Sequence, residues 1–204
     1  MLDTIIIGAG PAGLTALLYA VMYKMTAVCV GDKIGGKLIL APNIFDYPGI
    51  EAIIGKDFTA QLVNQIRKIN ASVEEVEVAS LKFMEVDDGK KFFEIKTISG
   101  KMFSGRTVIL ATGNGKKQAG DRLAKFTQGL NLIIKNKLLE VDAQMATNVP
   151  GVFAAGDCVM YPNSYEQLAT AVAMGIRAAG GVYNFLNGKF PPILWGEAQI
   201  QRII

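Results

Sequence analysis

The sequence predicts an α/β fold of the Rossmann-like type, with a central parallel sheet, in a single domain. A β-branched run at residues 5–7 is followed at once by Gly8-x-Gly10-x-x-Gly13 and then by an Ala- and Leu-rich stretch at 14–22. A strand that leads through such a glycine turn into a helix is typical of a β–α–β unit. At 204 residues, 50% of them hydrophobic, the chain suits one domain or one and a half.

Each glycine of this turn has a mechanical reason. Gly8 allows the tight turn, Gly10 allows a pyrophosphate to approach the backbone, and Gly13 allows the helix to pack closely on the strand. Free N–H groups at the start of the helix face the phosphates, and the helix dipole favours their charge. The motif therefore predicts dinucleotide binding. The alternative is a glycine-packed β–α turn that binds no ligand.

The second strand of this unit is predicted at residues 26–30. Such a unit often carries an acidic residue about 20 positions after the glycines, where it binds the ribose of the adenosine. Asp32 lies 19 positions after Gly13 and is the candidate, while Gly31 holds the very end of the strand. The alternative is that Asp32 is an ordinary solvated turn residue.

The middle of the chain predicts a helix and a β-meander. Segments 34–38 and 42–49 are rich in Gly and Pro and are expected to form loops. Residues 56–70 carry apolar side chains at helical spacing, and 73–78 alternate Val with Glu in part, as a strand does. Turn sequences separate three further predicted strands, which form the meander: 81–86, 92–98 and 101–103.

The second half predicts two more buried strands whose ends carry small residues. Residues 107–111 form one, which continues into Thr112-Gly113, and residues 152–155 form the other, which is closed by Gly156-Asp157. Parallel strands that end together at one edge of a sheet are where doubly wound folds bind their ligands. These strand ends are therefore expected to lie beside the glycine turn.

A long helix is predicted near the end of the chain. Ser164 and Gln167 have the spacing of a capping box, and the helix that they open is expected to run to about Phe185. The remaining predicted segments are a linker with a short helix, a hairpin, and a tail that holds the only tryptophan, Trp195: 114–128, 131–141 and 193–204.

Composition argues against several functions. Histidine is absent, and Cys29 and Cys158 belong to no CxxC, so we expect no metal site and a reducing compartment. The net charge of +3 is small and the lysines are scattered, which gives no basis for nucleic-acid binding. Residues 5–22 are apolar, but no basic residue precedes them and Gly and Pro interrupt them. We therefore expect neither a signal peptide nor a membrane span, and a soluble, cytoplasmic protein.

The three strand-end sequences, in this order, resemble the FAD domain of low-molecular-weight thioredoxin reductases, within the pyridine-nucleotide–disulfide oxidoreductases. The stretch 35–38, Gly-Gly-Lys-Leu, resembles that family's Gly-Gly-Gln-Leu, and 46–49, Asp-Tyr-Pro-Gly, resembles its Asn-Trp/Phe-Pro-Gly. The most specific piece, TNVPGVFAAGD at 147–157, is similar to the family's second FAD-binding signature. The resemblance covers nearly the whole chain. It implies a three-layer ββα Rossmann-like FAD-binding fold with a central parallel sheet and a β-meander.

The resemblance also implies roles for individual residues. The glycine loop would bind the FAD pyrophosphate, Asp157 a ribityl hydroxyl, and Gln167 and Leu168 would lie near N1 and O2 of the flavin ring. A helix N-terminus at that place stabilises the negative charge of the reduced flavin by ~0.3–1 kcal/mol. No residue makes a convincing acid–base or nucleophile pair, so no catalytic side chain is named. The implied FAD-binding residues are Gly8, Gly10, Pro11, Ala12, Gly13, Asp32, Gly36, Lys37, Leu38, Asp46, Ala111, Thr112, Gly113, Gly156, Asp157, Gln167 and Leu168.

The chain also departs from that family. Only about 40 residues separate Gly113 from Gly156, which is too few for the family's NADPH domain, and the sequence holds neither a second GxGxxG nor a CxxC. Lys37 and Asp46 replace a neutral Gln and Asn close to the expected place of the flavin. Residues 1–113 and 121–190 would correspond to the two halves of the family's FAD domain, 114–120 would replace the NADPH domain, and 191–204 would form a tail.

The sequence thus predicts an FAD-dependent oxidoreductase that takes electrons from a small external reductant, a partner protein or light. The alternative is a non-catalytic flavin-binding or assembly module, such as a reduced scaffold, and a third hypothesis is NAD(P) binding alone. A homodimer is predicted, because members of this family usually pair through their FAD domains and the last helix offers small residues at Ala171, Gly175 and Ala179. Trp195 is expected to pack on the domain's own surface or at a dimer contact, the alternative being stacking on the flavin.

Overall fold

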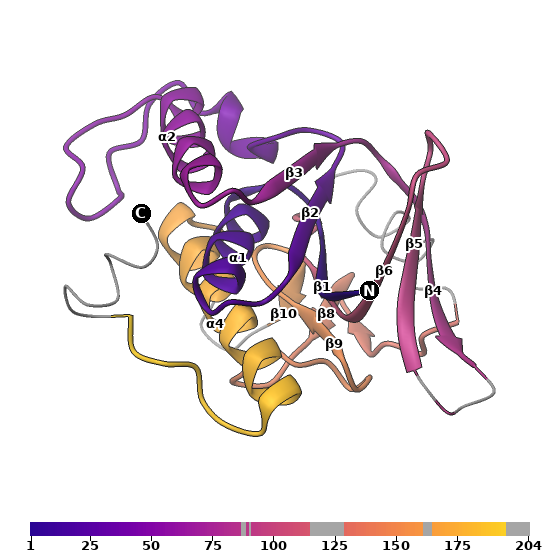
Figure 1. The fold of residues 1–204 in the computed structure, drawn as a ribbon. Helices are drawn as coiled ribbons and strands as arrows, with labels where there is room; N and C mark the ends of the chain where they lie inside the picture. The colour runs from indigo at the N-terminus through magenta and orange to yellow at the C-terminus, as the bar shows by residue number, and fades with distance from the viewer. Residues whose placement is uncertain (87–88, 90, 115–128, 161–164, 195–204) are drawn as a thin grey trace.

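A five-stranded parallel sheet forms the centre of the molecule (Figure 1). Strand β1 (Leu2–Ile7) lies in its middle, between β2 (Ala27–Gly31) and β6 (Met102–Leu110), with β3 (Ser72–Glu75) beyond β2 and β9 (Val152–Ala154) beyond β6. The buried β-branched residues of β1 explain its central position, since an interior parallel strand is covered on both faces. The computed structural model describes residues 1–86, 89, 91–114, 129–160 and 165–194.

Strand β6 belongs to two layers at once. Its first half pairs antiparallel with β5 (Lys91–Thr97), which pairs with β4 (Val78–Glu85) to form the meander. Its second half pairs parallel with β1 and β9, with Val108 opposite Val152. The prediction of two separate strands, 101–103 and 107–111, was therefore wrong. Residues 104–106, between the two predicted strands, are part of β6, because Gly105 pairs with Phe93 on one side and Leu2 on the other.

The predicted strand at 73–78 is also divided. Strand β3 ends at Glu75 and β4 begins at Val78, and between them the Val76 N–H makes a last hydrogen bond to β2, at the carbonyl of Gly31. At that point the chain leaves the parallel sheet and enters the meander.

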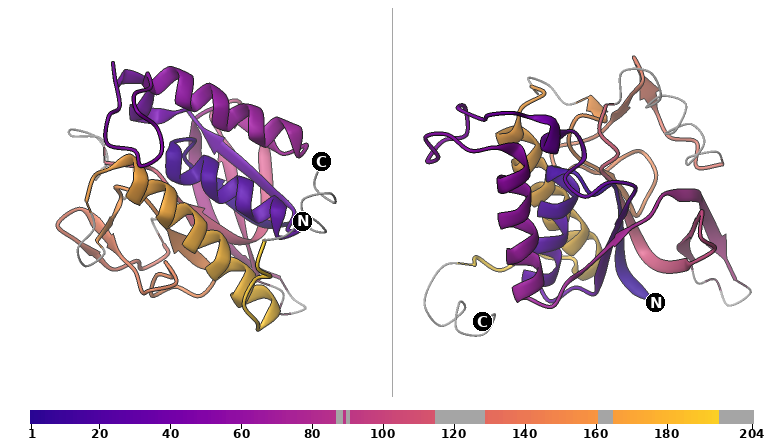
Figure 2. Two further views of the ribbon diagram at one scale, coloured as in Figure 1. Left: turned by 90° about the vertical axis from the view of Figure 1, so that its left-hand side faces the viewer. Right: turned by 90° about the horizontal axis from the view of Figure 1, so that it is seen from above.

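Three helices cover one face of the parallel sheet, and the meander lies on the other side. Figure 2, seen from above, shows α1 (Pro11–Met22), α2 (Gly55–Lys68) and α4 (Leu168–Asn187) on one side of the central strands. Helix α1 packs against both other helices and against β1 and β2. The predicted three-layer ββα architecture and the predicted single domain are confirmed. No helix of the described residues is long and apolar enough to cross a membrane.

Several local elements differ from the sequence prediction. Gly36–Leu40 forms a 3-10 helix, η1, inside a segment predicted as loop. The predicted hairpin at 131–141 is confirmed as β7 (Ile134–Lys135) and β8 (Leu138–Glu140), and an unpredicted strand, β10 (Val159–Met160), pairs with β8.

The start of α4 was also predicted wrongly. The helix begins at Leu168, and residues 165–167 precede it in non-helical conformation. Gln167 is the capping residue in place of Ser164, since its N–H donates to Thr170 Oγ1 at 3.3 Å and the Thr170 hydroxyl donates to its carbonyl at 2.8 Å. Ser164, Trp195 and all of the predicted linker and helix at 114–128 except Asn114 lie outside the described residues.

The small residues of α4 are used within the chain. Ala171, Gly175 and Ala179 are all buried, and a Cβ added to Gly175 would lie 2.4 Å from the backbone oxygen of Ala12 in α1. This stripe therefore lets α4 approach α1 and is not available to a second chain. The expectation that it offers a dimer contact was wrong, and the homodimer stays a prediction.

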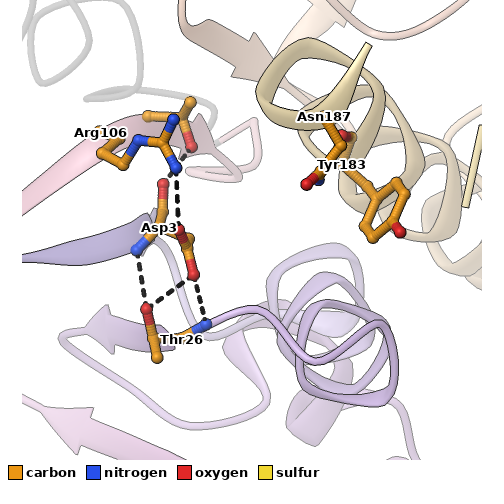
Figure 3. A network of polar contacts seen from close by, with 6 residues as sticks. Asp3, Thr26, Arg106, Tyr183 and Asn187 are labelled. Carbon is orange, nitrogen blue, oxygen red and sulfur yellow. Dashed lines mark hydrogen bonds and ion pairs between the residues drawn. The ribbon is translucent and has the colours of Figure 1, made fainter. Parts of the chain in front are cut away.

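A polar cluster at the amino ends of the central strands joins β1 to its neighbours (Figure 3). Asp3 Oδ2 accepts hydrogen bonds from the Thr26 N–H at 2.9 Å and the Thr26 hydroxyl at 2.8 Å, while Arg106 Nη1 lies 3.3 Å from Asp3 Oδ1. The figure also shows Asn187, whose Nδ2 donates to the Tyr183 carbonyl within α4. Burial raises the pKa of Asp3, but the hydrogen bonds from Thr26 and the Arg106 charge outweigh it and hold this pKa below its ordinary value.

Substitution of Gly175 by alanine is expected to destabilise the protein. The added methyl group would collide with the backbone of α1, and overpacking of this kind costs about 1–3 kcal/mol. Gly180, in the same helix, is the matched control, because its Cβ would lie 3.7 Å from Pro191 Cγ in ordinary contact. Gly180→Ala should be neutral or stabilise by about 0.4–1 kcal/mol. Urea unfolding checks both, and equal effects of the two substitutions would contradict the packing argument.

The Asp3 cluster is expected to make stability sensitive to acid. A carboxyl group with a lowered pKa adds stability above its ordinary pKa and loses it as the pH falls through the lowered pKa. Asp3→Asn should lower the free energy of unfolding by on the order of 1 kcal/mol near neutral pH, because the site is partly exposed. The difference from wild type should shrink below about pH 4. Urea unfolding from pH 7 to 3 measures it, with the exposed Asp46→Asn as control, and a pH-independent difference would refute the role of the charge.

Candidate functional site

The carboxyl ends of β1, β6 and β9 meet at one edge of the sheet and form the floor of a cleft of about 490 Å³. This volume lies within the range usual for small-molecule sites. The cleft collects segments that are far apart in the sequence: the glycine turn, the segment after β2 with η1, the end of β6, the end of β9, and the start of α4. All of the predicted site residues line it except Gly13 and Asp46.

The glycine turn lies with its backbone against the floor of the cleft. Gly8 has a φ of +112°, which side-chain-bearing residues rarely adopt, and its Cβ would lie 2.2 Å from the Ala111 oxygen. A Cβ on Gly13 would lie 1.8 Å from the Gly8 oxygen, so Gly13 lets α1 approach β1 from behind the cleft. At Gly10, which lines the cleft, an added Cβ meets nothing within 4 Å. The open side of the turn is therefore at Gly10.

The first turn of α1 faces the cleft without a side-chain cap. Gly10 is the N-cap residue, Pro11 follows it, and the first turn carries no acidic residue. The N–H groups at a helix start have no partner inside the helix, and they favour an anion that lies close to them. The chemistry of this end of the cleft therefore suits a phosphate group.

The segment after β2 supplies charged side chains to the cleft. Asp32 and Lys33 follow the strand directly, and Gly36, Lys37 and Leu38 belong to η1. Asp32 is exposed and already interacts with other groups of the protein. The predicted candidate for the ribose thus lies at the cleft.

Asp157 lies three residues after the end of β9 and makes an ion pair with Lys37. Its Oδ2 lies 3.8 Å from Lys37 Nζ, and its side chain is 25% exposed. Burial raises the pKa of Asp157, and the Glu166 charge raises it further, while the Lys37 charge lowers it; the pKa lies above its ordinary value. A carboxyl group with a raised pKa is costly to keep ionised, and such groups gather at functional sites.

Glu166 is a cleft residue that the sequence did not reveal. It lies between Tyr165 and the predicted Gln167, and its Oε1 accepts a hydrogen bond from Asn114 Nδ2 at 2.9 Å. This contact joins the segment after β6 to the segment before α4. Its position next to Gln167 was the only available signal, because the contact with Asn114 spans 52 residues. The other lining residues that were not predicted are Ala9, Lys33, Leu40, Ala155 and Ala171.

The two cysteines are buried structural residues. Burial raises the pKa of Cys29 to about 12, and its thiol donates to the Gly8 carbonyl at 3.5 Å. Burial also raises the pKa of Cys158, whose thiol donates to the carbonyls of Leu110 and Ala155. Both thiols therefore stay protonated at neutral pH and bond to the backbone that forms the floor of the cleft.

Gly13 and Asp46 are the two predicted site residues that do not line the cleft, and of these Asp46 belongs to a segment remote from the glycine turn. It is exposed in the segment between η1 and α2, which Figure 1 shows extending away from the sheet. Within that segment Tyr47 packs its ring on Phe58 of α2, with centroids 5.1 Å apart, and Ile44 pairs with Ile53. The ring contact holds the segment on α2, and the Ile44–Ile53 bridge holds its two ends together. Among the described residues, no group of three or more acidic or cysteine side chains could hold a metal ion.

Comparison with known proteins agrees with this geometry. The family model of the pyridine nucleotide-disulphide oxidoreductases matches residues 2–121 and 82–175. A thioredoxin reductase of Listeria monocytogenes serovar 1/2a is 33% identical over 119 residues, and a ferredoxin–NADP reductase of Bradyrhizobium sp. (strain ORS 278) is 34% identical over 121. These matches cover 58% and 57% of this chain, and 35% and 34% of the relatives. The match thus spans about a third of the length of these relatives.

A solved structure supports the assignment of the fold. The thioredoxin reductase of Gloeobacter violaceus superimposes with a TM-score of 0.82 at 18% sequence identity, over 96% of this chain and 98% of that one. At that identity the likeness establishes the fold, and it agrees with the order of strands and helices described above.

Proposed function

Since the chain belongs to the pyridine nucleotide-disulphide oxidoreductase family, we propose that it is an FAD-binding flavoprotein and acts as an FAD-dependent oxidoreductase. One observation carries the proposal: the glycine turn, the ends of β6 and β9, and the start of α4 converge on one cleft. An uncapped helix start lies at one part of this cleft and an ionisable carboxyl group at another. FAD carries both a pyrophosphate and a polyhydroxylated chain, so these two features suit it.

Different residues of the cleft would bind different parts of the cofactor. The open backbone at Gly10 and the start of α1 would hold the pyrophosphate, and Asp32 the ribose of the adenosine. Asp157 would accept a hydrogen bond from a ribityl hydroxyl, and the start of α4, at Gln167 and Leu168, would face the flavin. When bound, FAD supplies the redox chemistry, and the protein contributes its position and its electrostatic surroundings.

The electron donor is proposed to be external to this domain. Within the 204 residues there is no second GxGxxG and no CxxC, and the 42 residues between Gly113 and Gly156 are too few for a second βαβ-based nucleotide domain. A small reductant, a partner protein or light would then supply electrons to a flavin at the cleft.

The burial of both thiols favours a second candidate, a flavin-binding module without catalytic activity. Cys29 and Cys158 are protonated and bonded to the backbone, so neither provides a reactive sulfur at the cleft. Turnover of an electron acceptor distinguishes the two functions. A rate above that of free FAD supports the oxidoreductase, and a rate equal to that of free FAD supports the module.

The protein is expected to be yellow as purified, with one FAD per chain, and Gly10→Ala should lower FAD affinity by at least ~10-fold. Gly10 has a φ of −79°, which alanine adopts without strain, so the fold should tolerate the methyl group that obstructs the cleft. Fluorescence titration measures the affinity, thermal unfolding without FAD checks the fold, and Gly180→Ala is the control that adds a methyl group elsewhere. Unchanged FAD affinity in Gly10→Ala would remove the glycine turn from the site.

NADPH is expected to reduce the bound flavin slowly and without saturation. Fast hydride transfer needs the nicotinamide held about 3–3.5 Å from its acceptor, and such positioning is worth up to ~7–11 kcal/mol. Anaerobic stopped-flow with millimolar NADPH or NADH should show slow bleaching, while dithionite, or light with a sacrificial donor, should bleach the flavin readily. Saturable reduction at about 1 s⁻¹ or faster would reveal a nicotinamide site in this chain and refute the external donor.

A further inference from the structure

The Lys37–Asp157 ion pair lies where the proposed FAD site needs a hydrogen-bond acceptor. We propose that Lys37 is a positioning residue that keeps Asp157 ionised against the opposing charge of Glu166, so that the carboxylate can accept a hydrogen bond from the cofactor. The inference rests on the proposed function, and it makes the retention of FAD depend on pH.

The ion pair bridges two separate parts of the sheet edge. Lys37 belongs to η1, which follows β2, whereas Asp157 follows β9. In the strand order β3-β2-β1-β6-β9, the strands β1 and β6 lie between β2 and β9. The ion pair, with Lys37 Nζ 3.8 Å from Asp157 Oδ2, therefore joins segments that follow strands on opposite sides of β1 and β6.

Glu166 acts against Lys37. Its carboxylate lines the same cleft and is held by the hydrogen bond from Asn114 Nδ2 at 2.9 Å. Together with burial it disfavours a negative charge on Asp157, and Lys37 opposes both. Among the described residues, Asp32 and Lys33 are the other charged side chains that line the cleft, and Tyr165 lines a smaller adjoining cavity with Asp157 and Glu166. The thiol of Cys158, next in the chain, is buried and protonated.

The charge of Asp157 decides the strength of the proposed contact. An ionised carboxylate accepts a hydroxyl hydrogen bond that is about twice as strong as a bond between neutral groups. As the pH falls and Asp157 takes up a proton, this contact weakens. Removal of Lys37 raises the pH at which this hydrogen bond weakens, and removal of the Glu166 charge lowers that pH.

Titration of the cofactor-free protein tests the electrostatic part directly. Carbon-13 NMR follows the Asp157 carboxyl signal, which is assigned by its absence in Asp157→Asn. We expect a higher midpoint in Lys37→Gln, a lower one in Glu166→Gln, and recovery of the wild-type midpoint in Lys37→Arg. Glu166→Gln keeps the side-chain oxygen that Asn114 bonds to. Lys33→Gln is the matched control, because it removes the same charge from the cleft and should leave the midpoint in place. An unchanged midpoint in Lys37→Gln would overturn the inference.

FAD affinity measured across pH tests the functional part. The wild-type affinity should fall as the pH drops through the Asp157 midpoint, and Lys37→Gln should fall at higher pH. Asp157→Asn should bind more weakly at high pH and show no such dependence. A loss in Lys37→Gln by the same factor at every pH would overturn the inference, because it would make Lys37 a contact for the phosphates. If no variant, nor the wild type, binds FAD while the NMR midpoints shift as expected, the proposed function fails and the cofactor role of Lys37 fails with it.

Discussion

The close approach of α1 to the parallel sheet is the constraint on which the rest of the structure depends. An added Cβ at Gly13 would lie 1.8 Å from the Gly8 oxygen, so only glycine at this position allows the approach. Because α1 lies so close, its first turn reaches the edge where β1, β6 and β9 end. Gly175 then lets α4 pack on α1 and brings the start of α4 to the same cleft. The packing of α1 on the sheet and of α4 on α1 therefore places both helix starts at the cleft.

The sequence predicted the parts of the fold that local patterns specify. The glycine turn, the buried strands and the strand ends at Gly113 and Gly156 were all found, because each combines an apolar run with small residues. The continuity of β6 was not found, because Ser104 and Arg106 interrupt the apolar pattern while Gly105 pairs on both sides. Glu166 was missed for a different reason: its hydrogen bond to Asn114 exists only after the chain has folded.

Two further differences arise from tertiary packing that the local sequence pattern does not reveal. The small residues of α4 suggested a surface that a second chain could use, but α1 of the same chain covers them. Asp46 was expected at the cleft from its position in a stretch that resembles the family, whereas ring packing between Tyr47 and Phe58 holds that segment on α2. Neither contact leaves a periodic signal, since the partners are separate in sequence and belong to different elements.

The double membership of β6 has a mechanical consequence for the whole domain. One continuous strand runs from the meander to the cleft, so its register with Phe93 and its register with β1 and β9 are locked together. A deletion of one residue within β6 would displace one of these pairings by about 3.3 Å and turn its side chains to the opposite faces. The turn at Gly100 lies between β5 and β6, outside the paired residues, and can therefore accommodate inserted residues. The pairing of β6 within the meander thus sets the position of Thr112-Gly113 at the cleft. Added residues are tolerated in the turn between β5 and β6 but not within β6 itself.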